Sequence, residues 1–188
     1  MVARAEATVA LRERIVDSTE RLFEALASDR FSLEEVAEGA DTTVQTVLRH
    51  FGSKDELLRA TMTRAMDRVR AERMLAPVGD VPAAVRNLVD HYEHRGDVVL
   101  RWLAEEGRNP FMHEVLDRGR AFHHEWVAET FAPQLKRTTG AAAQRRRLAQ
   151  LVAITDVYVW KLLSRDMALP RAQTQAAIIE LIEALERT

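Results

Sequence analysis

The chain has 188 residues, of which 47% are hydrophobic and 30% charged, and its formal net charge at pH 7 is −2. This balance is normal for a folded chain of one or two domains, and it excludes a disordered or low-complexity protein. The absence of cysteine excludes a disulfide framework, thiolate catalysis and cysteine-based zinc sites.

The distribution of glycine and proline indicates the fold class. Seven glycines and five prolines divide the chain into segments of helical length, and the alternating patterns of strands are missing. We therefore predict an all-α fold of about nine helices, with a three-helix N-terminal domain followed by a C-terminal bundle. No apolar leader and no run of about 18 apolar residues is present, so we expect a soluble, cytoplasmic protein without a membrane partner.

The first predicted helix covers residues 8–28. Its apolar side chains recur every three or four residues, which is the pattern of a helix with one buried face. These side chains are Leu11, Ile15, Leu22, Phe23 and Leu26.

Two short helices are predicted next. Ser32 and Glu35 have the spacing of a capping box, so one helix should begin at Ser32 and end near Gly39. Thr43 is a suitable N-cap for a second, which reaches His50. The intervening turn, residues 39–42, contains glycine and aspartate, which both tolerate a bent backbone.

A longer helix and five further segments complete the prediction. Ser53 and Glu56 form a second capping-box pattern, which opens a connecting helix within residues 53–76. The domain boundaries are then 1–52 for the helix-turn-helix domain and 77–188 for the second domain. Helical segments of the second domain are expected at 82–95, 97–107, 110–137, 142–166 and 171–187.

Two short helices packed on a longer first helix form the architecture in which the second short helix enters the DNA major groove. In this chain the stretch FSLEEVAEGADTTVQTVLRHFGSKDELL, residues 31–58, resembles the TetR family of transcriptional regulators. The resemblance implies an all-helical homodimer that binds operator DNA through residues 43–50. It also implies regulation from the C-terminal domain, most commonly repression that is relieved by a small-molecule effector.

The chemistry of the side chains suggests their roles on DNA. Gln45 can pair with an adenine edge, Thr43 and Thr46 can bind a base or a phosphate, and Val44 can make an apolar contact. Arg49, His50 and Lys54 are suited to phosphates, which fix register rather than sequence.

The charge of this domain opposes the DNA-binding interpretation. Residues 1–56 carry seven basic and twelve acidic side chains, a net charge of −5, and Glu34 lies where a neutral or basic residue is more usual in the family. We therefore expect weak non-specific binding. The alternative is a helical ligand-binding or metal-dependent bundle that has lost DNA binding.

Aromatic residues of the second domain suggest an effector site. Bundles bind small molecules in apolar clefts between helices, so we expect a small, largely apolar effector. The predicted contacts are Trp102, Phe122, Trp126 and Tyr158, although any one of them could instead be an ordinary core residue.

The last two predicted helices, 142–166 and 171–187, have the strongest apolar faces, and we expect them to form the homodimer interface. They could alternatively be interior members of the bundle.

Histidines invite a metal hypothesis, but solvated or hydrogen-bonded histidines are the more ordinary explanation. His91 and His94 lie three residues apart, and His123 and His124 are adjacent. Neighbouring helical residues point about 100° apart, so one of that pair at most could join a site. No convergent acid, base or nucleophile pattern is found, so we expect neither an enzyme nor a resident cofactor.

Overall fold

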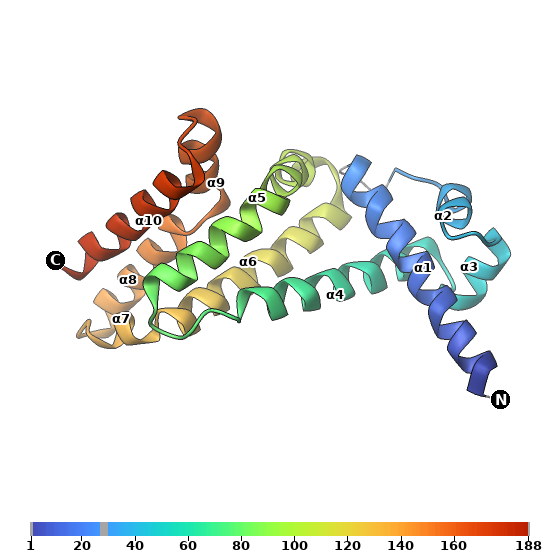
Figure 1. Cartoon of the computed structure of the whole chain (residues 1–188), viewed down its shortest axis with the longest axis horizontal. Helices are drawn as coiled ribbons and strands as arrows, with labels where there is room; N and C mark the ends of the chain where they lie inside the picture. Colours follow the sequence, from blue (N-terminus) through green and yellow to red (C-terminus); the bar gives the residue numbers. More distant parts are fainter. Residues whose placement is uncertain (1, 27–29, 188) are drawn as a thin grey trace. The chain divides into compact units, whose positions relative to one another are not determined.

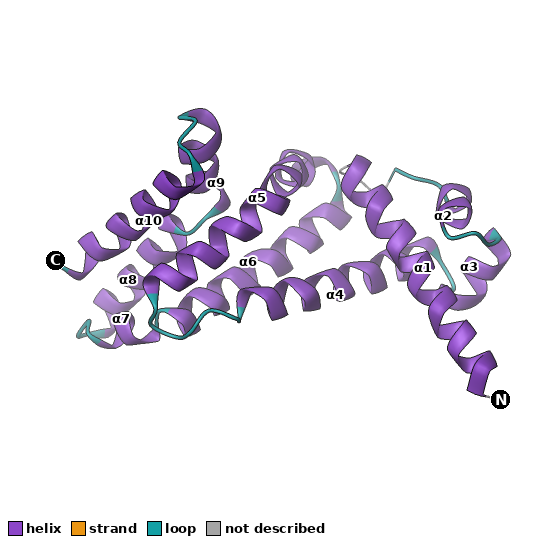
Figure 2. Cartoon of the chain, viewed as in Figure 1, coloured by secondary structure: helices purple, strands orange, loops and turns teal. Residues whose placement is uncertain are grey.

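The computed structural model describes residues 2–26 and 30–187. All regular structure in these ranges is helical, as Figure 2 shows, which confirms the all-α class. None of the helices in the described ranges has both the length and the apolar character needed to cross a membrane. The chain divides into two compact units, Met1–Arg68 and Val69–Thr188, and the division falls within one helix.

Four helices begin the chain (Figure 1): α1 (Val2–Leu26), α2 (Leu33–Gly39), α3 (Val44–Phe51) and α4 (Lys54–Arg73). Helix α1 begins six residues before its predicted start, because residues 2–10 contain four alanines and no helix breaker. Its predicted end at residue 28 lies outside the described residues. Leu26, expected on the buried face, is 50% exposed, whereas Ile15 and Phe23 are fully buried.

The core of the first unit joins α1 to the short helices. Helix α1 contacts α2, and α2 contacts α3. The largest buried side chains of this core are Ile15, Phe23, Phe31, Leu57 and Leu58.

An ion-pair network also joins α1 to α4. The buried carboxylate of Glu20 pairs with Arg68 and, at 3.0 Å, with Arg64. Asp17 lies 2.5 Å from the same Arg64 guanidinium. Two acidic side chains of this unit are therefore neutralised within it.

The second unit contains α5 (Val81–Glu105), the 3-10 turn η1 (Glu106–Arg108), α6 (Pro110–Thr130), α7 (Ala132–Lys136), α8 (Ala141–Ile154), α9 (Val157–Trp160), the π-helical segment η2 (Lys161–Asp166) and α10 (Arg171–Glu186). Helix α5 contacts α6, α9 and α10, and α8 contacts α6 and α10 (Figure 1). The described residues thus form ten α-helices, where nine helices were expected.

The first difference from the predicted elements is at Gly96, which was read as a separator between 82–95 and 97–107. Instead α5 runs through it without a break. A Cβ atom at this position would lie 2.3 Å from the ring of Trp160. Glycine is therefore present because α5 and the Trp160 ring approach closely, and not because the helix ends.

The other two differences are breaks within predicted helices. The segment 110–137 is interrupted at Phe131, because Pro133 has no N–H for the carbonyl of Glu129 and cannot continue α6. The segment 142–166 is interrupted at Thr155, where Asp156 caps a new helix by accepting a 2.9 Å hydrogen bond from the backbone N–H of Tyr158.

Candidate nucleic-acid interface

The turn between α2 and α3 is built by backbone hydrogen bonds. Asp41 adopts a left-handed conformation with φ of 51°. This lets its N–H donate to the Glu38 carbonyl (3.1 Å) and the N–H of Thr42 donate to the Ala37 carbonyl (2.9 Å). The pattern is a Schellman motif, which satisfies the last carbonyls of α2 and redirects the chain toward α3.

The start of α2 is fixed by the predicted capping box. The Ser32 hydroxyl accepts from the N–H of Glu35 at 3.1 Å, and the Glu35 carboxylate accepts from the N–H of Ser32 at 2.6 Å. The Glu35 carboxylate is thus engaged with α2 itself. Glu34, beside it, is exposed in the first turn of α2.

Two arginines of α1 brace the same turn. Arg14 donates to the carbonyl of Ala40 at 3.4 Å, and Arg21 donates to the carbonyl of Gly39 at 3.3 Å. Neither arginine was predicted to be a site residue. Their spacing of seven, which places both on one face of α1, was the available signal.

Helix α3 buries one face and exposes the other. Val47 and Phe51 are buried against the domain. Gln45 and Arg49 are exposed and lie four residues apart, so they share the outward face. This face offers an amide, which can read a base edge, next to a cation, which can bind a phosphate.

The predicted threonine contacts are partly used by the helix itself. The Thr43 hydroxyl accepts from the N–H of Thr46 at 3.2 Å, as the predicted N-cap, and lies 3.0 Å from the Thr46 hydroxyl. Thr43 is exposed, whereas Thr46 and Val44 are half-buried. Their contacts with DNA stay predictions.

Lys54, predicted to bind phosphate, is engaged within the unit. Its ammonium donates to the carbonyl of Phe31 and lies 4.7 Å from the centre of the Phe31 ring. Lys54 thus ties the start of α4 to the segment before α2, and its phosphate contact stays a prediction.

Two other basic groups lie beside Phe51, at the end of α3. The His50 ring lies 6.4 Å from the Phe51 ring. The exposed guanidinium of Arg12, which was not among the predicted site residues, lies 4.7 Å from the centre of the same ring. Arg12 therefore adds a cation of α1 to the end of α3.

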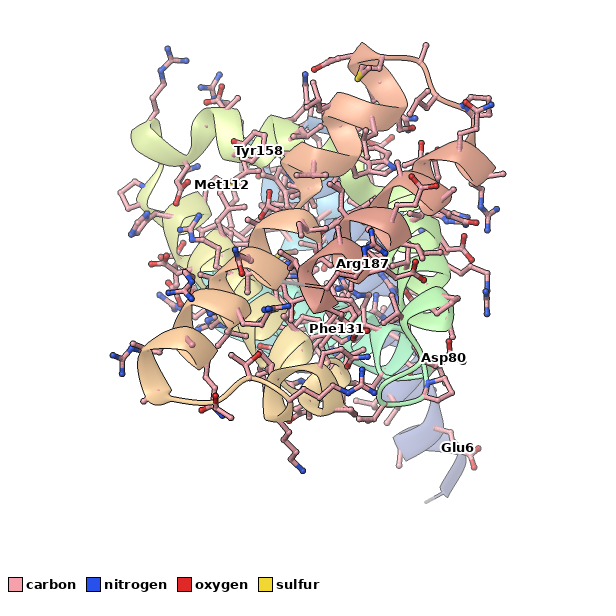
Figure 3. The ribbon with its side chains drawn as sticks, turned by 90° about the vertical axis from the view of Figure 1, so that its left-hand side faces the viewer. Glu6, Asp80, Met112, Phe131, Tyr158 and Arg187 are labelled. Atoms are coloured by element: carbon pink, nitrogen blue, oxygen red, sulfur yellow. The ribbon has the colours of Figure 1, made fainter. Side chains whose placement is uncertain are left out.

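The structure does not place the four predicted effector contacts in one buried cluster. Phe122 and Trp126 are buried on α6, Trp102 is half-buried on α5, and Tyr158, labelled in Figure 3, is 57% exposed. Their role as effector contacts stays a prediction.

A cluster of possible metal ligands lies elsewhere in the second unit. Glu106, His113 and Asp117 bring their ligand atoms within 4.8 Å of one another. The guanidinium of Arg120 lies 2.5 Å from an oxygen of each carboxylate. This internal cation already pairs with both carboxylates and offsets one of their two charges, so the cluster has the character of a surface ion-pair network.

A unit in which a Schellman turn joins two short helices, the second with an exposed polar face, is a helix-turn-helix domain of the DNA-binding class. Residues 15–61 match the family model described as bacterial regulatory proteins, tetR family. The first unit thus matches the DNA-binding region of the TetR family, over about a quarter of the chain.

Solved structures share the fold over nearly the whole chain. A transcriptional regulator from Rhodococcus sp. Rha1 has a TM-score of 0.66 at 18% identity, over 92% of this chain and 94% of that one. A TetR-family transcriptional regulator from Streptomyces coelicolor has a TM-score of 0.66 at 22% identity, over 95% of each chain. The comparison with curated proteins found no match.

Proposed function

We propose that the chain is a TetR-family regulator, a homodimer that binds a specific operator and represses transcription until an effector binds its second unit. The observation that carries the proposal is the outward face of α3, where Gln45 and Arg49 are exposed while Val47 and Phe51 anchor the helix. Polar side chains on a two-turn helix add little to the core, so the presence of these residue types on α3 needs another explanation. Reading a major groove supplies one.

Exposed apolar side chains support the homodimer. The segment from α9 to α10 exposes Tyr158, Leu162, Met167 and Leu181. Exposed apolar groups gathered on neighbouring elements favour burial in an interface. A two-fold dimer would present two copies of α3 to half-sites about 34–36 Å apart, which compensates for the few contacts that one short helix makes.

Helix α4 supports regulation from the second unit. It begins at Lys54, directly after the helix-turn-helix, and ends at Arg73, within the unit that begins at Val69. An effector would tilt this helix and change the separation of the two α3 copies. It can do so only by binding the DNA-incompetent state more tightly.

The test is a gel-shift titration with the DNA that lies upstream of the protein's own gene. We expect Gln45→Ala to relax the preference at one base pair and Arg49→Ala to weaken binding to all sequences. The Arg49 variant should also reduce the dependence of log affinity on log salt by about one ion. Lys54→Ala should act in the same direction, and its fold needs checking because Lys54 binds the Phe31 carbonyl.

Arg118→Ala is the matched control, because this exposed arginine of α6 pairs with Glu114 in the second unit. It should leave both affinity and salt dependence unchanged. If Gln45→Ala and Arg49→Ala both bind the operator as tightly as the parent, the assigned interface is wrong. A parent protein that binds no DNA would favour the bundle without DNA function, in line with the −5 charge of residues 1–56.

A further inference from the structure

A buried cation without a counter-ion lies in the second unit. Arg73, the last residue of α4, is 3% exposed. Its Nε and Nη2 atoms have no hydrogen-bond partner among the described residues, its side-chain hydrogen bond is to the Tyr92 hydroxyl, and no carboxylate of those residues pairs with it. Removing a charge from water without a partner is costly, so buried arginines are normally paired.

Aromatic rings surround this guanidinium. Its central carbon lies 3.9 Å from the ring centre of Trp126 and 6.0 Å from that of Tyr92. The Trp126 indole N–H donates to the backbone carbonyl of Arg73 at 3.1 Å, which fixes the two residues together. Ring faces attract a cation, but they supply no negative charge.

His91, His123 and Tyr92 supply no negative charge either, and the further charges that act on them are of both signs: Asp156 acts on Tyr92 and Arg95 acts on His91. Burial, with the nearby charge of Arg73, lowers the pKa of His91 to about 3 and that of His123 to about 4, so both are neutral at pH 7. Burial raises the pKa of Tyr92, which therefore keeps its proton. Burial also lowers the pKa of Arg73, but a guanidinium starts so high that it stays charged. Arg73, Tyr92, His91 and His123 together therefore carry one positive charge.

Two imidazole nitrogens beside Arg73 are also without partners. These are the Nδ1 atoms of His91 and His123. The Nε2 atom of His123 lies 3.4 Å from the Val152 carbonyl and 3.2 Å from the Thr155 hydroxyl, which donates its own hydrogen to the Leu151 carbonyl. We therefore assign the hydrogen to Nε2 and a lone pair to Nδ1. His91 has no such constraint and can donate from Nδ1. The site therefore combines hydrogen-bond donors on Arg73 of α4 and His91 of α5 with an acceptor, the Nδ1 atom of His123 on α6.

We propose that the effector is an organic monoanion, a carboxylate on a largely apolar body, held by the Arg73 guanidinium between Trp126, Tyr92 and the two histidines. A single negative charge neutralises the site, whereas a phosphate dianion would leave it negative in surroundings that are mostly aromatic. The guanidinium fork matches a carboxylate, and the rings suit an apolar body. The anion site itself is independent of the proposed function, and only the role of its ligand as the effector rests on that function.

The test compares carboxylates with their uncharged analogues on the full-length protein. Octanoate and 2-naphthoate are titrated by calorimetry without DNA, each beside the primary alcohol of the same body. We expect the carboxylates to bind about tenfold more tightly or better, because only they neutralise Arg73. Equal binding of acid and alcohol, or no binding of either acid, would overturn the proposal without any mutation.

Arg73→Met removes the charge and keeps most of the volume. We expect it to abolish the preference for carboxylates and to leave the thermal midpoint of the ligand-free protein unchanged or higher, because an uncompensated charge is lost. The control is Arg70→Met, one turn earlier on α4, where the arginine already pairs with Glu125 at 2.6 Å. It should keep the preference. An Arg73→Met variant that keeps the preference, or that is strongly destabilised, assigns Arg73 a structural role and contradicts the proposal.

A separate measurement tests whether carboxylate binding at this site also changes DNA binding. Operator binding is followed by fluorescence anisotropy while octanoate or 2-naphthoate is added. Release of DNA by the parent and not by Arg73→Met supports both the site and its function. Carboxylate binding that leaves DNA binding unchanged keeps the anion site and refutes its role as the effector site.

Discussion

At the scale of single residues, several polar side chains of the helix-turn-helix are already hydrogen-bonded to the protein backbone, so they are not free to contact DNA alone. Ser32 and Thr43 cap helices, and Lys54 holds the carbonyl of Phe31. Loss of one of these groups therefore changes stability as well as DNA contacts. Gln45 and Arg49 differ, because the structure exposes both on the outward face of α3. Substitutions at these two positions are the cleaner probes of recognition.

Asp41 offers a test of the turn itself. It holds a φ of 51°, a conformation that glycine adopts without steric cost. We expect Asp41→Gly to raise the free energy of unfolding of the first unit by about 0.5–1 kcal/mol, and Asp41→Val to lower it. Urea unfolding followed by circular dichroism checks both. A lower stability for Asp41→Gly would mean that the aspartate side chain contributes more than its backbone strain costs.

The same scale explains which site features could be predicted. The caps at Ser32 and Thr43 were predicted correctly because both partners lie within three residues in the sequence. The Lys54 bond spans 23 residues and the Trp126 bond to Arg73 spans 53. Such pairs depend on tertiary packing, which no local pattern encodes. Arg73 could not be predicted as a candidate site residue, because the sequence around it on α4 resembles that around any solvated arginine.

At the scale of elements, helix starts were easier to predict than helix interiors. The boundaries of α2 and α3 were predicted to within a residue or two, because caps and glycine mark them. Gly96 was misread because a glycine required for close packing looks the same in sequence as one that ends a helix. Pro133 did carry a local signal for the break between α6 and α7, but the apolar periodicity of 110–137 concealed it.

Two mid-helix glycines make a matched pair for testing this packing. A Cβ at Gly96 would meet the Trp160 ring at 2.3 Å, whereas one at Gly119 in α6 would meet nothing within 4 Å. We expect Gly96→Ala to lower the free energy of unfolding of the second unit by about 1–3 kcal/mol. Gly119→Ala should raise it by about 0.5–1 kcal/mol through helix propensity. Thermal unfolding of both variants gives the comparison, and equal shifts would refute the close approach.

At the scale of the whole molecule, two half-buried histidines tie stability to pH. The native pKa values of His91 and His123 are about 3 and 4, below the usual 6.5 of an unfolded chain. Between these values the unfolded chain binds protons that the native protein does not. Stability therefore decreases as pH falls from about 6.5 toward 4, with a slope of up to about 2.7 kcal/mol per pH unit for two groups. Above pH 7.5 this contribution is constant.

Urea unfolding across this pH range is the measurement. We expect the double variant His91→Gln, His123→Gln to lose stability less steeply with acid than the parent. The exposed neighbour His124 provides the control, since His124→Gln should leave the slope unchanged. An unchanged slope in the double variant would show that other groups, such as the paired carboxylates, dominate acid unfolding.

The placement of the tryptophans has a practical consequence for such experiments. All three, Trp102, Trp126 and Trp160, belong to the unit Val69–Thr188, as do both tyrosines. Intrinsic emission therefore records the melting of the second unit alone, while the far-ultraviolet signal of the helices records both. A gap between the two transition curves would reveal that the first unit unfolds at a different temperature from the second.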